Sequence, residues 1–200
     1  MTTDFKNSET KINLMKAFAG ESQARNRYTF AAEKAMKQKL HVIECVFRFT
    51  ADQEKEHATI FMNHLKEAEG ETIAIDGTFP VETTESIVQL LRNAEHNEAE
   101  EFDPIYKTFA ETAEREGFPA IAHSFRSIAQ IEKTHCERFR KFAELMENGQ
   151  LFVSDMECGW ICLNCGHVHT GKAVPAQCPV CQHDQGYFVR ITLAPYTSAC

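Results

Sequence analysis

The chain has no long uninterrupted run of apolar residues, and its first six residues lack the basic segment and apolar stretch of a secretory signal. A membrane-spanning helix needs about 20 predominantly apolar residues. We therefore expect no transmembrane segment and no export, with the cytoplasm as the default location. Basic residues are fewer than acidic ones, 21 against 29, so the formal net charge is −8. This charge disfavours nucleic acid and anionic membranes as main partners.

The sequence contains no G-x-G-x-x-G fingerprint for dinucleotide binding. If the protein carries out redox chemistry, we expect its electrons to come from a separate reductase or small redox protein. The remaining composition is that of a soluble globular protein, with 43% hydrophobic and 25% charged residues in a chain of 200. This length allows one or two domains with a sizeable core.

The eight cysteines are unevenly distributed along the chain. Cys45 and Cys136 stand alone in helical patterns, and we expect both to be small core residues. Five others fall between Cys158 and Cys181. Such clustering, in a chain without an export signal, indicates metal binding rather than a disulfide framework.

Apolar residues spaced three and four apart predict four helices that pack as a bundle. The helices are expected at about residues 4–37, 41–69, 83–116 and 119–149. The segment 70–82 contains two glycines and a proline and is read as a connection that crosses the end of the bundle. Pro104 falls inside the third pattern, and we expect it to kink that helix.

Glutamate and histidine interrupt the core-facing stripe of each predicted helix. Glu132-x-x-His135 and Glu54-x-x-His57 are the strongest instances, since each places two metal ligands one helical turn apart. A buried, unpaired carboxylate is costly, so a metal ion is its natural partner. The inward-facing ligands predicted on the four helices are Glu21, Glu54, His57, Glu95, Glu98, Glu132 and His135.

The two halves of the helical region echo each other. Glu21 precedes Glu54-x-x-His57 by 33 residues, and Glu95 precedes Glu132-x-x-His135 by 37. One Glu and one Glu-x-x-His from each half match the ligand set of ferritin-like dinuclear carboxylate bundles. Four carboxylates offset the charge of two divalent ions, and oxygen and imidazole ligands suit iron or manganese.

Three further kinds of residue lie on or beside these stripes: a tyrosine, an unmatched glutamate and the acids that follow it. Tyr28 shares a face with Glu21, so it either hydrogen-bonds near the site or packs in the core. Glu98 has no counterpart in the first half, where Ala24 stands. The acids that follow it are expected to form a solvated face: Glu100 and Glu101.

Two Cys-x-x-Cys turns, at Cys162/Cys165 and Cys178/Cys181, are separated by twelve residues. Four thiolates bind zinc or a single iron tetrahedrally, zinc making a structural ribbon and iron a one-electron carrier. Cys158 lies outside both turns and is expected to be a free thiol. Because helical periodicity ends near residue 149, we predict a bundle domain at 1–149 and a small tetracysteine domain at 151–200.

The combined motifs resemble those of the rubrerythrin family over essentially the whole chain. The residues that carry the resemblance are Gly20-Glu21-Ser22-Gln23-Ala24-Arg25, Glu54-x-x-His57, Glu95-x-x-Glu98, Glu132-x-x-His135, Trp160 and the two cysteine turns, with Pro179 inside the second. The resemblance implies a mainly α fold, a ferritin-like four-helix bundle followed by a small β and loop rubredoxin-like domain. It also implies two non-haem irons in the bundle and one iron at the cysteines.

The resemblance further implies an activity, the two-electron reduction of hydrogen peroxide to water in oxidative-stress defence. By position, Glu54 and Glu132 would bridge the irons. Glu21 and His57 would bind one ion, and Glu95 and His135 the other. Glu98 would replace His57 on oxidation, so Glu98, His57 and Tyr28 are the expected catalytic residues. Family members usually pair head to tail, so a homodimer or larger assembly is expected.

One departure from the family pattern affects this assignment. Asp103 stands where a tyrosine commonly precedes the third-helix proline, so the support of Glu98 is expected to differ. Two rival functions stay open at this point. One is a ferroxidase or oxygen-reducing oxidase built on the same bundle, and the other is a non-catalytic zinc-ribbon protein whose bundle binds a partner or stores metal.

Overall fold

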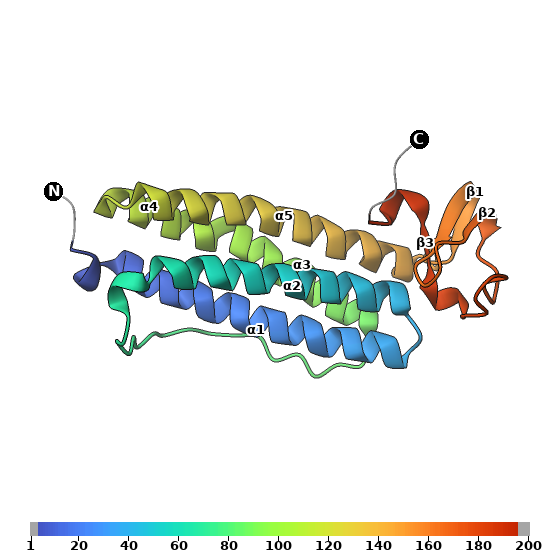
Figure 1. Ribbon diagram of the computed structural model, residues 1–200, viewed down its shortest axis with the longest axis horizontal. Coiled ribbons are helices and arrows are strands. Elements are labelled where there is room, and N and C mark those ends of the chain that lie inside the picture. Colours follow the sequence, from blue (N-terminus) through green and yellow to red (C-terminus); the bar gives the residue numbers. More distant parts are fainter. Residues whose placement is uncertain (1–3, 196–200) are drawn as a thin grey trace.

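The computed structural model describes residues 4–195; the outermost residues of the two predicted domains, 1–3 and 196–200, lie outside the described part. Its helices are α1 (Glu9–Lys37), α2 (His41–His64), α3 (Ile87–Glu100), α4 (Tyr106–Glu116) and α5 (Pro119–Glu147). They form an elongated bundle in which α3 and α4 together make the third of four rods (Figure 1). Single 3₁₀ turns lie at Phe5–Asn7, Lys66–Ala68, Gln185–Tyr187 and Ile191–Leu193.

Local sequence explains where several helices begin and end. Ser8 and Ser86 cap α1 and α3, because each side chain accepts a hydrogen bond from the backbone N–H three residues on. Gly117 has a φ of +90° and ends α4, a conformation that costs glycine little. Pro119 occupies the first turn of α5, where its missing N–H leaves no bond unmade.

The third rod is interrupted at the predicted proline. Residues Glu101–Ile105 form η3, a wide π-type turn in which Asp103 has an extended backbone (φ −153°, ψ 116°). Proline has no N–H and its ring clashes with the preceding turn, so α3 ends before Pro104 and α4 begins at Tyr106. A wide turn adds a residue to the helical path. Side chains after it therefore sit one position later than a continuous helix would place them.

The connection from α2 to α3 runs along α1 for most of the bundle's length, rather than across one end as expected (Figure 1). Four cations of α1 hold it in turn. Their partners are Glu71 for Lys11 (3.2 Å), Asp76 for Lys16 (2.8 Å), Glu82 for Arg27 (2.9 Å) and the Thr84 carbonyl for Lys34 (2.6 Å). The connection returns the chain to the end of the bundle where α2 begins, so α2 and α3 run in the same direction (Figure 1).

Beyond α5 the chain forms a small antiparallel sheet in the order β2-β1-β3. Its strands are β1 (Val153–Cys162), β2 (Val168–Ala173) and β3 (Phe188–Arg190). Trp160 is fully buried beneath it and donates its indole N–H to the Gly171 carbonyl at 2.9 Å. This small core surrounds two of the predicted cysteine ligands, Cys162 and Cys178.

The sheet domain packs against the end of the bundle where α1 meets α2. His41 stacks on Tyr187 with ring centroids 4.0 Å apart. Gly186 approaches the bundle so closely that a Cβ there would lie 1.9 Å from the Lys39 carbonyl oxygen. A glycine at this position is what allows the contact.

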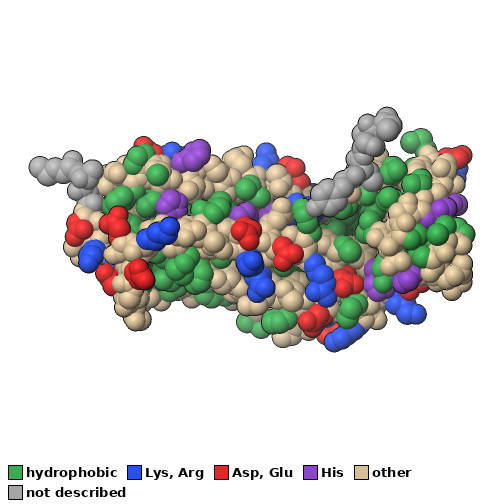
Figure 2. Space-filling view, viewed as in Figure 1, with side chains coloured by type: hydrophobic (Ala, Val, Ile, Leu, Met, Phe, Trp, Pro, Cys, Tyr) green, Lys and Arg blue, Asp and Glu red, His purple; other side chains and the backbone are tan. Residues whose placement is uncertain are grey.

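Two apolar clusters divide the bundle core, with polar residues between them. One contains Phe47 and Phe139, and the other contains Phe61 and Phe125. On both α2 and α5 a Glu-x-x-His pair lies between the two clusters. In contrast to this largely apolar core, the surface of the bundle carries interspersed acidic and basic side chains on the face that Figure 2 shows. Among residues 4–195, no helix combines the length and apolar character that a membrane span requires.

Candidate metal centres

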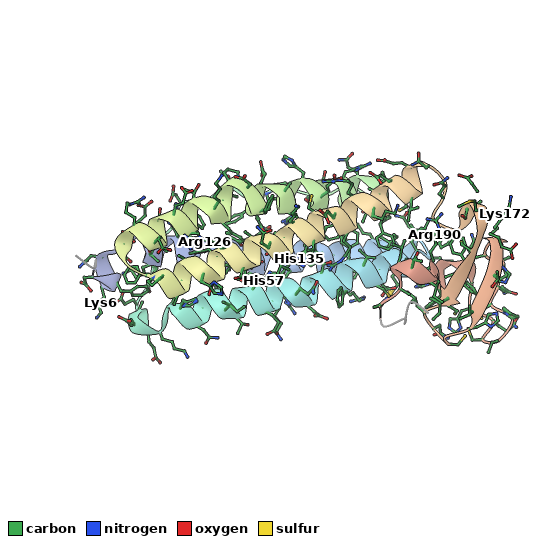
Figure 3. The ribbon with its side chains drawn as sticks, turned by 90° about the horizontal axis from the view of Figure 1, so that it is seen from above. Lys6, His57, Arg126, His135, Lys172 and Arg190 are labelled. Atoms are coloured by element: carbon green, nitrogen blue, oxygen red, sulfur yellow. The ribbon has the colours of Figure 1, made fainter. Side chains whose placement is uncertain are left out.

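Six of the predicted bundle ligands meet in the middle of the bundle, and each is at most 4% exposed. Their ligand atoms form two groups, and the atoms of each group all lie within 4.8 Å of one another. One group contains Glu21, Glu54, His57 and Glu132, and the other contains Glu54, Glu98, Glu132 and His135. His57 on α2 and His135 on α5 lie about midway along the bundle (Figure 3). Two carboxylates belong to both groups.

The shared carboxylates each turn one oxygen toward each histidine. The Oε2 atom of Glu54 lies 3.1 Å from His57 Nδ1, and its Oε1 atom lies 3.0 Å from His135 Nδ1. Glu132 repeats the pattern, with Oε1 2.9 Å from His57 Nδ1 and Oε2 2.7 Å from His135 Nδ1. A carboxylate so placed can bind two ions at once.

Each group also holds one carboxylate of its own, positioned by a tyrosine. Glu21 Oε2 lies 3.7 Å from His57 Nδ1, and Tyr106 donates a hydrogen bond to Glu21. Tyr28 donates to Glu98, whose Oε2 lies 3.4 Å from His135 Nδ1. Burial, followed by the charges of nearby glutamates, raises the pKa of both phenols well above its usual range, so both keep the proton they donate.

Several polar atoms of these two groups have no hydrogen-bond partner in the described part of the chain, as expected of metal ligands. Both oxygens of Glu132, one oxygen each of Glu21, Glu54 and Glu98, and Nδ1 of His135 are buried without hydrogen-bonding geometry to any described residue. Burial, and after it the charges of neighbouring carboxylates, raises the pKa of Glu21 to about 8 and that of Glu132 well above its usual range. Cations between them would relieve both deficits, and the two groups fit two iron ions.

The four predicted cysteine ligands also converge, and their ligand atoms lie within 4.8 Å of one another. Across the two turns, the sulfurs of Cys162 and Cys181 are 3.8 Å apart, and those of Cys165 and Cys178 are 3.6 Å apart. A hydrogen bond from the backbone N–H of His183 lowers the pKa of the Cys181 thiol to about 6, which favours the thiolate that binds metal, whereas burial raises the pKa of Cys162 to about 12. This site fits one iron.

The family model described as Rubrerythrin matches residues 13–143, and the model described as Rubrerythrin, rubredoxin-like domain matches residues 160–189. This chain belongs to the rubrerythrin family. It is 45% identical to the rubrerythrin of Porphyromonas gingivalis over 94% of its own length and 92% of that protein. It is 39% identical to the rubrerythrin of Nitratidesulfovibrio vulgaris, with coverages of 92% and 94%.

Solved structures agree with this membership. The chain superposes on mixed-valence nigerythrin with a TM-score of 0.62 and 25% identity, covering 94% of this chain and 92% of that one. Bacterioferritin BfrA of Mycobacterium tuberculosis gives a TM-score of 0.61 over 74% of this chain and 90% of its own, at 15% identity. The latter likeness concerns the ferritin-like fold alone. The rubredoxin-like domain that follows the bundle in this chain is identified by its own family model.

One predicted ligand of this rubrerythrin-family chain is misplaced by the sequence argument. Glu95 lies outside both groups, on the bundle surface, where it pairs with Arg92 at 2.6 Å and with Arg140 at 2.8 Å. Glu98 occupies the place that was predicted for Glu95. The prediction treated the third rod as one continuous helical pattern, whereas the wide turn η3 interrupts it after Glu98, and the buried face of α3 carries Ala94 and Glu98.

A spacing in the sequence could have revealed the correct register. Glu98 precedes Glu132 by 34 residues, much closer than Glu95 does to the interval of 33 between Glu21 and Glu54. The extra residue is the one that η3 inserts. The tyrosine spacings show the same single insertion, since Tyr106 follows Glu98 by eight residues whereas Tyr28 follows Glu21 by seven. Asp103, noted as a departure from the family, therefore does not stand at the position of the supporting tyrosine.

Glu101 was predicted to lie on a solvated face, and the structure places it elsewhere. It is only partly exposed, and what it faces is a cavity beside the metal groups. Burial, then the charges of Glu21 and Glu98, hold the pKa of its carboxyl well above the usual range. In the repeat it corresponds to Ala24, so the acid without a counterpart is Glu101 and not Glu98.

The two histidines differ in what holds their second ring nitrogen. Nε2 of His135 lies 3.1 Å from Gln53 Oε1, which also accepts a hydrogen bond from Arg138 at 3.0 Å. This contact fixes the tautomer that leaves Nδ1 free to bind metal. Within residues 4–195, no hydrogen bond holds Nε2 of His57. His57 is therefore the less restrained of the two.

The predictions for cysteines outside the two Cys-x-x-Cys turns are confirmed for Cys136 and Cys158 and wrong for Cys45. Cys136 is buried, as expected for a core residue. Cys45 is exposed, so the core interpretation is wrong for it. Its place on α2 turns it toward the sheet domain, where its charge would act on Tyr187. Cys158 is a free thiol outside the tetracysteine group, as predicted.

Proposed function

We propose that this chain is a non-haem di-iron peroxidase that reduces hydrogen peroxide to two water molecules with two electrons and two protons. The observation that carries the proposal is the pair of buried four-residue groups that share Glu54 and Glu132. Membership of the rubrerythrin family and the separate tetracysteine site support it. The protein would act in oxidative-stress defence in the cytoplasm.

Residues of this chain would hold the two irons in a nearly symmetric way. Glu21 and His57 would bind one ion, and Glu98 and His135 the other, with the two shared carboxylates between them. When bound, the iron pair supplies the two electrons that cleave the O–O bond. Tyr28 acts as a positioning residue here, because it touches Glu98 and not the place where substrate would lie.

We assign to Glu101 the exchanging role that the sequence analysis gave to Glu98. The Glu101 carboxyl interacts most strongly, among the charged groups, with Glu21 of the His57 group. His57 lacks the contact that restrains His135, so it can leave its position when Glu101 approaches. A harder carboxylate suits a ferric ion better than imidazole does.

Electrons would enter at the tetracysteine iron from a separate reductase or small redox protein. The sheet domain contacts the bundle at His41, and His57 lies sixteen residues further along α2. At 1.5 Å per residue this separation is about 24 Å. A route between two chains paired head to tail, as the family resemblance implies, would be shorter, so we propose a homodimer or larger assembly.

The test is the visible spectrum of the fully reduced, anaerobic protein mixed with hydrogen peroxide or with oxygen. We expect the colour of ferric tetrathiolate to return rapidly with peroxide and more slowly with oxygen. Faster return with oxygen would move the function to a ferroxidase or oxygen-reducing oxidase. A protein that stays colourless would contain zinc at the cysteines, and the peroxidase proposal would lose its electron entry.

A further inference from the structure

A cavity of about 670 Å³ opens between α1, residues 75–80 of the connection, and the η3 turn. One water molecule occupies about 30 Å³ in the liquid, and hydrogen peroxide has only one more oxygen atom. The cavity is therefore far larger than the proposed substrate needs. Its volume is typical of pockets that bind small organic molecules, about 300–1,000 Å³.

The inner wall of the cavity is shared with the metal groups. Tyr106 lines it and donates a hydrogen bond to Glu21. Glu101 also lines it, and its carboxyl interacts electrostatically with Glu21 and Glu98. A molecule in the cavity would consequently lie against residues that reach the reacting centre.

The outer wall favours an uncharged ligand with an apolar part. Aromatic and aliphatic side chains contribute to it, including Phe79 and Ile105, which are 48% and 37% exposed. The lining cations Lys16 and Arg27 already pair with Asp76 and Glu82. Glu100 adds negative charge. An anionic ligand would meet this acid without an unpaired cation among the described lining residues to offset it.

We propose that this cavity admits an uncharged alkyl or aryl hydroperoxide, which the adjacent site reduces to the alcohol and water. The inference rests on the proposed function, because the two electrons come from the same reduced iron pair. The O–O bond breaks, two protons are taken from solvent, and the organic oxygen leaves as the hydroxyl of the alcohol. Hydrogen peroxide and the organic hydroperoxide would differ only in the part that occupies the cavity.

Gly20 offers open space for a side chain at the cavity. It lies on α1 at the cavity, and a Cβ added there would meet no atom within 4 Å. Leucine also has a better helix propensity than glycine, so we expect the Gly20→Leu variant to fold. Thr108→Trp fills the cavity from the α4 side at an exposed position. Asn26→Leu, exposed on α1 and outside the cavity, is the matched control.

The experiment compares kcat/KM for cumene hydroperoxide and hydrogen peroxide in the iron-loaded, full-length protein. We expect wild type to reduce both, and Gly20→Leu and Thr108→Trp to lower the ratio of the first to the second at least tenfold. Asn26→Leu should leave the ratio unchanged. Calorimetry with the alcohol product, 2-phenyl-2-propanol, on the oxidised protein should show binding that weakens at least tenfold in the two cavity variants.

Failure of the inference can be separated from failure of the proposed function. Turnover of hydrogen peroxide without cumene hydroperoxide would overturn the inference and leave the proposed function intact. Turnover of neither peroxide would overturn the proposed function together with the inference. Equal losses for both peroxides in the cavity variants would also overturn the inference, because the cavity would then be a general route and not a site for the organic part.

Discussion

At the scale of single residues, position decides function among chemically identical side chains. Glu95, Glu98 and Glu101 follow one another at intervals of three on the same rod. The first pairs with arginines at the surface, the second faces His135, and the third lines the cavity. The tyrosine contact supports the assignment of Glu98, since the buried phenol of Tyr28 donates a hydrogen bond to it.

Glu98→Ala and Glu95→Ala form a matched pair that tests this assignment. Loss of even an outer-shell partner typically weakens metal binding 10- to 100-fold, so we expect Glu98→Ala to lose at least this much affinity at one iron position. Glu95→Ala should retain both irons, and its exposed ion pairs are worth about 1 kcal/mol or less. Iron content after gel filtration measures the difference. Loss of iron from Glu95→Ala alone would reverse the assignment.

Glu101→Gln tests the exchanging carboxylate. Glutamine keeps the size of the side chain and removes the negative charge, so we expect both irons to stay bound in the ferrous protein. Reoxidation by hydrogen peroxide should slow at least tenfold, because the amide cannot take the place of His57 on a ferric ion. Stopped-flow absorbance of the reduced protein provides the measurement, with Glu100→Gln as control. An unchanged rate would remove Glu101 from the mechanism.

At the scale of elements, periodicity in the sequence predicted the helices and most of the site. Glu-x-x-His on α2 and α5 lies in core-facing slots, which a pattern of period 3.6 identifies. The interruption at Pro104 was also predictable, but its register was not, because a proline marks a break without specifying how many residues the turn inserts. The path of the connection along α1 depends on ion pairs such as that of Arg27 with Glu82. A loop has no periodic pattern from which such pairs could be predicted.

Ligands on α1 and α2 together create a pH dependence of metal binding. In the metal-free protein burial raises the pKa of Glu21 to about 8, so its carboxyl is protonated below that pH. For His57 burial lowers the pKa, but hydrogen bonds to Glu21 and Glu54 outweigh it and raise the value to about 10. A metal ion must displace these protons, so affinity rises as pH rises toward 8.

Anaerobic titration with ferrous ion between pH 6 and 7.5 measures this effect. Each displaced proton contributes about a tenfold gain in affinity per pH unit. We expect at least that slope, with proton release detectable in weakly buffered solution. An affinity independent of pH would show that these groups are already deprotonated without metal.

At the scale of the whole molecule, the sheet domain is fixed at one end while the buried carboxylates lie near the middle. The close approach of Gly186 to Lys39 and the stacking of His41 on Tyr187 hold the domain there. The α2 helix alone separates that end from His57 by about 24 Å. Geometry within one chain therefore places electron entry far from the proposed reaction.

Mixing two inactive variants tests whether electrons cross between chains. Cys178→Ser removes a ligand of the tetracysteine site, and Glu98→Ala removes one from the bundle site. Each variant alone should reduce peroxide poorly. Coexpressed as mixed assemblies, they should recover a substantial part of wild-type turnover, because an intact tetracysteine site on one chain can serve the intact bundle of the other. Mixed assemblies as inactive as the separate variants would place the electron route within a single chain, whatever its length.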